Sequence, residues 1–209
     1  MALDKSTLET AILNVFTSMT DGSIDKFSDG ITNAIVSFVS NGEVSTVDMG
    51  TITAGAFVGT GSGEISVTST DCTKVLKNAC KKMNGETSED ETYDDDYLAE
   101  QFGFALKAMS DNATVDTDVQ GTVTTTTGAT STLEGSASGS IACVSTSLVT
   151  SLKTLFSTMY EKREETGYNG DSEFASTLAD AIYSFWTSGV ISTNGSETLA
   201  GSIGVGALS

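Results

Sequence analysis

The sequence predicts an α+β fold of three tandem repeats, each an antiparallel helix hairpin followed by a short β-hairpin or small sheet. Three observations predict it. One apolar spacing recurs in three segments, a second apolar spacing follows each of them, and a stretch rich in Thr and Val with alternating glycines closes each segment. The predicted units are residues 3–67, 68–143 and 144–209.

The first helix of each unit is predicted from apolar residues at i, i+4, i+7, i+8 and i+11, which share one face of an α-helix. The residues with this spacing are Leu8, Ile12, Val15, Phe16 and Met19, then Cys72, Leu76, Ala79, Cys80 and Met83, then Leu148, Leu152, Leu155, Phe156 and Met159. Ser6 and Glu9 have the spacing of a capping box, which predicts the start of the first helix.

The second helix of each unit repeats the same offsets. Its residues are Phe27, Ile31, Ala34, Ile35 and Phe38, then Leu98, Phe102, Ala105, Leu106 and Met109, then Phe174, Leu178, Ala181, Ile182 and Phe185. The alanine shared by the three sets predicts that two helices approach closely there. Gly42 and Gly189, directly after two of these helices, predict left-handed C-terminal caps.

Thr- and Val-rich stretches follow the helices and predict strands. They open at residues 44–46, 115–117 and 191–193 and end in glycine-alternating tails at 59–65, 135–141 and 201–206. The glycines predict close approach of backbones rather than side-chain packing. A unit of about 70 residues is marginal alone, so we expect strands of successive units, or of another subunit, to complete the sheets.

The composition limits the classes of partner. The net charge is −18, from 28 acidic and 10 basic residues. Such a surface repels nucleic acid and anionic membranes and favours partners with basic patches. No apolar stretch has the length of a membrane-spanning helix, and Met1–Lys5 places charges where the apolar core of a signal peptide would begin. We therefore expect no nucleic-acid or membrane partner.

The sequence predicts no catalytic, cofactor-binding or metal-ligating residue and no small-molecule substrate. Histidine, the commonest general base, is absent. The glycines of residues 59–63 lack the G-x-G-x-x-G form of a dinucleotide site, and no G-x-S-x-G motif occurs. Cys72 and Cys80 would lie about 12 Å apart on one helix and cannot pair. With Cys143 they are expected to be small buried apolar residues, which fits synthesis in a reducing compartment.

Two acidic segments leave cation binding open. The run Ser88–Tyr97 contains Glu89, Asp90, Glu91, Asp94, Asp95 and Asp96. Clustered carboxylates suit Ca²⁺, although the run lacks the spacing of an EF-hand loop. Asp116 and Asp118 form a second pair. The simpler interpretation of residues 84–97 is a solvated acidic loop. The lone Trp186 is expected in the core or at an interface.

Two short amphipathic helices, a Thr/Val stretch and a G-x-G-x-G end, in a chain that begins Met-Ala-Leu-Asp-Lys-Ser, resemble small virion structural proteins of tailed bacteriophages. The segment Phe174–Ile182 with the glycine-rich C-terminus is the best match, and the chain departs by carrying three units.

This resemblance implies a non-enzymatic component of the virion (tail, baseplate, neck or capsid surface), made in the host cytoplasm. It implies no cofactor, and assembly into a symmetric multi-copy structure with itself and other virion proteins. A surface adhesin or receptor-binding module is the alternative.

Overall fold

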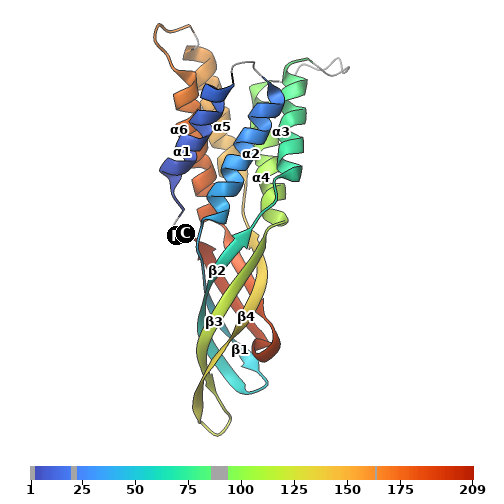
Figure 1. Ribbon diagram of the computed structural model, residues 1–209, viewed down its shortest axis with the longest axis vertical. Helices are drawn as coiled ribbons and strands as arrows, with labels where there is room; N and C mark the ends of the chain where they lie inside the picture. The colour runs from blue at the N-terminus through green and yellow to red at the C-terminus, as the bar shows by residue number, and fades with distance from the viewer. Residues whose placement is uncertain (1–2, 20–22, 86–93, 163) are drawn as a thin grey trace.

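The computed structural model describes residues 3–19, 23–85, 94–162 and 164–209. The helices stand side by side at one end of the molecule, and the strands form a narrow barrel that projects from them (Figure 1). The helices are α1 (Lys5–Ser18), α2 (Ile24–Ser40), α3 (Thr70–Met83), α4 (Asp95–Asp111), α5 (Thr146–Lys162) and α6 (Gly170–Thr187). The strands are β1 (Val44–Ile52), β2 (Gly55–Ser66), β3 (Thr114–Thr124), β4 (Thr130–Ala142), β5 (Val190–Gly195) and β6 (Ser202–Leu208), with the short 3-10 helix η1 (Glu197–Leu199) before β6.

The helices α1, α2, α4 and α6 begin at polar side-chain caps. The carboxylate of Asp4 accepts a hydrogen bond from the backbone N–H of Ser6 at 3.0 Å, and that of Asp94 accepts one from the N–H of Tyr97 at 2.9 Å. The predicted capping box of Ser6 and Glu9 is therefore wrong, because α1 begins at Lys5 and is capped by Asp4. A carboxylate is favoured at this place because it also interacts with the positive end of the helix dipole.

The predicted left-handed caps at Gly42 and Gly189 are also wrong. Neither glycine has a positive φ, and the capping residues before them, Asn41 and Ser188, have φ of −91° and −84°. A side chain at Gly42 would instead displace a neighbouring leucine. A Cβ on Gly42 would lie 2.9 Å from Cδ1 of Leu208, at the junction between helices and barrel.

The six helices form a closed ring. Each packs against the next along the chain, and α6 packs against α1. The apolar faces predicted from the spacing point into a common core, with Leu8, Leu76 and Leu152 among the fully buried side chains. The prediction is confirmed except at the end of α3, where Cys80 and Met83 are half-buried and lie outside this core. Salt bridges link neighbours across the ring surface, including Lys77 to Asp25 at 2.8 Å. Such exposed pairs contribute little to stability.

Phe174 is the centre of an aromatic cluster inside the ring. Its ring centroid lies 5.2 Å from that of Phe16 and 6.1 Å from that of Phe156. The centroids of Phe27 and Phe102 lie 6.3 and 6.4 Å away. These five rings come from five different helices. One side chain therefore joins helices that are far apart in the sequence.

The six strands form one closed antiparallel barrel in chain order. Each strand pairs with the strands before and after it, and β1 pairs with β6. In that closing pair Val44 lies opposite Leu208. Glu43 and Ser209 extend it by exchanging two backbone hydrogen bonds of 2.9 and 3.0 Å. The C-terminus is thereby fixed where the barrel meets the helices (Figure 1).

This architecture corrects the predicted fold class. Three tandem repeats, each with its own helix hairpin and its own β-hairpin or small sheet, are wrong because one barrel and one helical ring take up all the described elements. The pairs β2–β3, β4–β5 and β6–β1 join strands of different predicted units. Pairing between successive units was one of the two expectations for completing the sheets, but the closure of all six strands into one barrel was not predicted. The boundaries at residues 67/68 and 143/144 stay a prediction.

Two apolar layers fill the barrel. Near the helices, inward side chains of every strand continue the core of the helical ring; they are Val44, Ile65, Val115, Ile141, Ile191 and Leu208. At the far end a second, separate cluster contains Ile52, Phe57, Val119, Val123, Ala137 and Leu199. Leu199 comes from η1, which covers the barrel beyond the ends of the short strands β5 and β6.

Replacing Phe174 with Ala tests the aromatic cluster. We expect a loss of about 3–5 kcal/mol in the free energy of unfolding, because a buried ring is removed and four neighbouring rings lose contact with it. Urea denaturation followed by circular dichroism measures this. Phe104→Ala on α4 is the matched control, since that ring is 62% exposed. Equal effects of the two substitutions would contradict the assignment.

Candidate functional site

A polar layer separates the two apolar layers of the barrel. Thr46, Thr117 and Thr193 are buried and face inward from β1, β3 and β5. Glycines stand opposite them on the neighbouring strands: Gly61 and Gly206 beside Thr46, Gly63 beside Thr117, and Gly139 and Gly204 beside Thr193. An eight-stranded barrel is just filled by its side chains, so six strands leave less room still. Small inward residues are the consequence.

Asp48 lies in this layer and is fully buried. The hydroxyl of Thr46 donates a hydrogen bond to Oδ2 of the carboxylate at 2.6 Å, and that of Thr193 donates one to Oδ1 at 3.4 Å. A Cβ on Gly204 would lie 2.2 Å from Oδ1, so the carboxylate fits only beside a glycine. Asp48 is therefore held inside the barrel, with a threonine hydroxyl on each of its carboxylate oxygens.

The glycine tails line the barrel interior and bring adjacent strands close together. A Cβ would lie 2.0 Å from the carbonyl oxygen of Asp116 at Gly63, and 1.9 Å from that of Ser192 at Gly139. These distances confirm the predicted close backbone approach. The approach is between strands of this one chain, so the glycines themselves are used within the barrel and not for contact with the backbone of another subunit.

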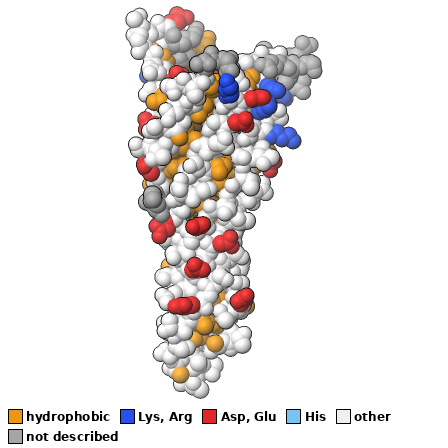
Figure 2. All heavy atoms as spheres, in the orientation of Figure 1, with side chains coloured by type: hydrophobic (Ala, Val, Ile, Leu, Met, Phe, Trp, Pro, Cys, Tyr) orange, Lys and Arg blue, Asp and Glu red, His pale blue; other side chains and the backbone are white. Residues whose placement is uncertain are grey.

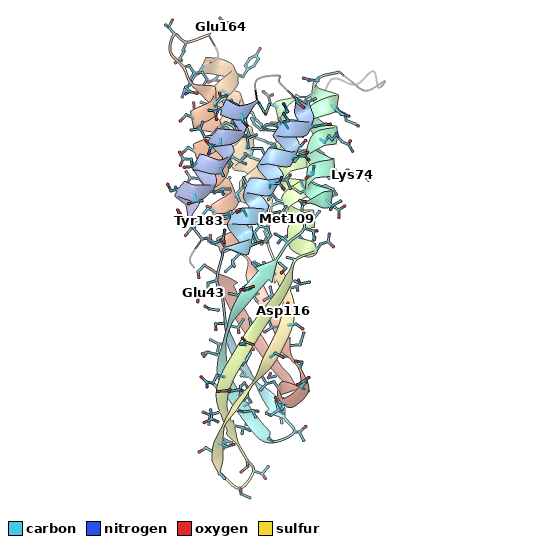
Figure 3. All side chains as sticks on the ribbon, viewed as in Figure 1. Glu43, Lys74, Met109, Asp116, Glu164 and Tyr183 are labelled. Atoms are coloured by element: carbon cyan, nitrogen blue, oxygen red, sulfur yellow. The ribbon has the colours of Figure 1, made fainter. Side chains whose placement is uncertain are left out.

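The outside of β2, β3 and β4 forms an acidic groove. A hollow of about 880 Å³ lies where the barrel meets the helices, and its lining includes Glu43, Glu64, Asp116 and Asp118. A second hollow of about 490 Å³ shares Asp118 and adds Glu134 further along the barrel. Figure 3 shows Glu43 and Asp116 at this junction. The groove can attract basic side chains.

Charge is divided between the two parts of the molecule. Every lysine lies in a helix, and the strands contain acidic residues but no basic one. In Figure 2 the Lys side chains in view lie on the helical part, while the charged side chains on the barrel face in view are Asp and Glu. Lys74, labelled in Figure 3, lies on α3, well away from the barrel. The barrel therefore presents a negative field to any partner.

An apolar face interrupts the polar surface of the barrel on β6, β1 and β2. Five outward side chains, each between 50% and 61% exposed, form it: Val47, Met49, Val58, Ile203 and Val205. The strand register makes them neighbours, because Val47 lies opposite Val205 and Met49 lies opposite both Ile203 and Val58. We call these five residues the apolar face.

The two acidic segments singled out in the sequence do not form one site. Asp116 and Asp118 point outward into the groove, while Asp94 caps α4 and Asp96 accepts a hydrogen bond from Lys153 at 3.1 Å. Glu89, Asp90 and Glu91 lie outside the described residues. Within the described ranges, no group of three or more His, Cys, Asp or Glu is close enough to hold a metal ion.

The three cysteines are thiols packed in the helical part or at its junction with the barrel. None of them forms a disulfide, and Cys72 and Cys143 are buried as predicted, whereas Cys80 is half-buried. Burial raises the pKa of all three thiols to about 11. Thiolates are therefore scarce at neutral pH, which makes these side chains poor nucleophiles.

Trp186 is fully buried near the C-terminal end of α6, which places it in the core. Sequence reasoning missed Asp48 and the apolar face. Asp48 lies an even number of positions along the strand from Val44 and from Ile52, so its side chain points to the same, inward side. This alternation was the signal in the sequence that could have placed Asp48 inside. For the apolar face, the signal was that β1 has apolar residues on both of its sides: Val44 and Ile52 face inward, and Val47 and Met49 face outward.

No family model, curated protein or solved structure matches this chain. Among the described residues, no helix has both the length and the apolar character needed to cross a membrane.

Replacing Thr46 with Val tests the polar layer. The substitution keeps the shape of the side chain but removes the shortest hydrogen bond of a buried carboxylate. We expect a loss of about 1–3 kcal/mol in the free energy of unfolding. Thr122→Val on the exposed side of β3 is the control, and we expect it to be close to neutral. A neutral Thr46→Val, measured by urea denaturation, would mean that Asp48 does not depend on this contact.

The thiols predict a loss of stability in alkali. Their pKa is about 11 in the folded chain against 9.0 for a free thiol, so the folded state holds its protons more tightly. This contribution is fully present below pH 9 and is lost as the pH rises through 11. The urea midpoint should fall over that range, and less steeply in the variant Cys72→Ala/Cys143→Ala. Equal slopes would contradict the assignment.

Proposed function

We propose that this chain is a non-enzymatic structural protein of a bacteriophage virion, which assembles into a symmetric multi-copy structure with itself and other virion proteins. The observation that carries the proposal is the apolar face on an otherwise polar and acidic barrel. Contiguous exposed apolar side chains on a soluble surface mark contacts with other macromolecules. The sequence resemblance to small virion proteins supplies the setting.

The buried chemistry of the chain supports this proposal over an enzyme. Asp48 is closed off from solvent, and its oxygens are used by two threonine hydroxyls. The thiols of Cys72 and Cys143 are buried and protonated at neutral pH. These groups hold the fold together and are not directed at an open cavity. The surfaces left to act are the apolar face and the acidic groove.

A surface adhesin or receptor-binding module remains the second candidate, and the acidic groove is the feature that favours it. Its size, about 880 Å³, suits several side chains of a partner. Because Glu64, Asp116 and Asp118 line it and the strands contain no basic residue, that partner would be basic. An adhesin of this kind would bind host cells in a salt-dependent manner.

Quantitative mass spectrometry of purified particles tests the main proposal. In a phage whose genome encodes this chain, we expect the chain to remain with density-purified particles in a fixed multiple of copies per particle. A host protein of similar abundance in the lysate serves as the control for carry-over. Loss of the chain during purification, or less than one copy per particle, would contradict the proposal.

Binding of the purified chain to host cells tests the second candidate, the adhesin. Purified chain that binds host cells, and loses binding in the variant Asp116→Asn/Asp118→Asn, would favour the second candidate. Thr122→Asn on the same strand is the control, because it keeps the charge unchanged.

A further inference from the structure

We infer that the apolar face is the contact by which two copies of this chain associate, barrel against barrel. The inference deepens the proposed function and rests on it, since it names the partner with which a multi-copy assembly would form. Two observations lead to it, the shape of the face and its lack of charge, while its area sets the expected strength.

The face is continuous and centred on one strand. Val47 and Met49 project from β1, with Val58 of β2 on one side and Ile203 and Val205 of β6 on the other. The pairing of β1 with both neighbours keeps these side chains at fixed spacings on a curved but regular surface. A rigid surface loses little conformational entropy on association.

The face lacks charge, in a chain that otherwise carries a large negative excess. The remaining outward residues around it are small or polar: Ser45, Thr51, Ala56, Thr60 and Ala207. The acidic residue of β1, Asp48, points into the barrel. Two copies with a net charge of −18 each repel one another, so they can meet with least repulsion at a face without carboxylates.

A second copy fits this face better than a basic partner does. A basic partner gains most at the acidic groove, which lies on β2, β3 and β4. The apolar face offers such a partner no opposite charge. Two like faces bury valine, isoleucine and methionine against each other, which is the self-complementary contact of a twofold pair.

The area sets the expected strength. The five residues of the face span three residue positions along the strands and three strands across, which covers roughly 140 Å² of the sheet, against roughly 800 Å² buried by each partner in a stable pair. The pair should therefore be weak and reversible in solution, with a dissociation constant in the micromolar range or above. Many copies held in one particle would make such a weak contact effective.

Sedimentation velocity of the purified chain over about 1 µM to 1 mM tests the inference. We expect a reversible monomer–dimer equilibrium that shifts toward dimer as salt screens the repulsion. The variant Val47→Asp places a carboxylate on both sides of a twofold contact, and we expect its dissociation constant to rise by about tenfold or more. Thr132→Asp on the exposed side of β4 adds the same charge away from the face and should leave the constant within about twofold.

The variant Met49→Gln weakens the proposed contact in a second way, without adding a charge. It keeps the length of the side chain while removing apolar surface, and we expect weaker association with an unchanged circular dichroism spectrum. A monomer at every concentration would overturn the inference, as would a dimer that survives Val47→Asp and Met49→Gln. Equal weakening by Thr132→Asp would also overturn it.

The measurement keeps this inference separate from the proposed function. A chain that dimerises through the face but is absent from particles would contradict only the virion proposal. A monomeric chain that is abundant in particles would contradict only the pairing. A monomeric chain that floats with uncharged phosphatidylcholine vesicles would assign the face to lipid and also overturn the pairing.

Discussion

The narrow interior of the six-stranded barrel is the constraint on which the rest of the structure depends. Large side chains fit only at its two ends, where Ile65 and Phe57 are buried. Between the ends, glycines allow neighbouring backbones to meet, and threonine hydroxyls satisfy the carboxylate of Asp48. The glycine-alternating sequence and the buried polar layer thus have one physical cause.

Closure of the barrel decides how the chain can meet a partner. Because β1 pairs with β6, the described strands leave no free edge to which a strand of another chain could add. Contacts made by the barrel must therefore use side chains on its outer faces. One of these faces is acidic and hollowed, and another is apolar and uncharged. The two faces suit different partners, and the helical ring, which carries every lysine, adds a third kind of surface.

The helices and their buried faces could be predicted from the sequence. An apolar spacing such as that of Leu8 and Ile12 indicates both that the segment is helical and which face of the helix is buried. The strand partners could not be predicted. Alternation in a strand indicates which residues face inward but not which strand lies beside it. The sequence therefore left open whether strands pair within the chain or with another subunit, and the single closed barrel was not predicted. Asp48 was missed because an aspartate is usually exposed, although its parity places it inside.

Hydrogen exchange of the strand amides, followed by NMR, tests the closed barrel most directly. The account predicts that the amides of β1 that are hydrogen-bonded to β6 exchange as slowly as those of β3, which has a partner on each side. Fast exchange confined to β1 and β6 would show an open sheet with two edges, and it would contradict both the closure and the argument that partners bind through side-chain faces.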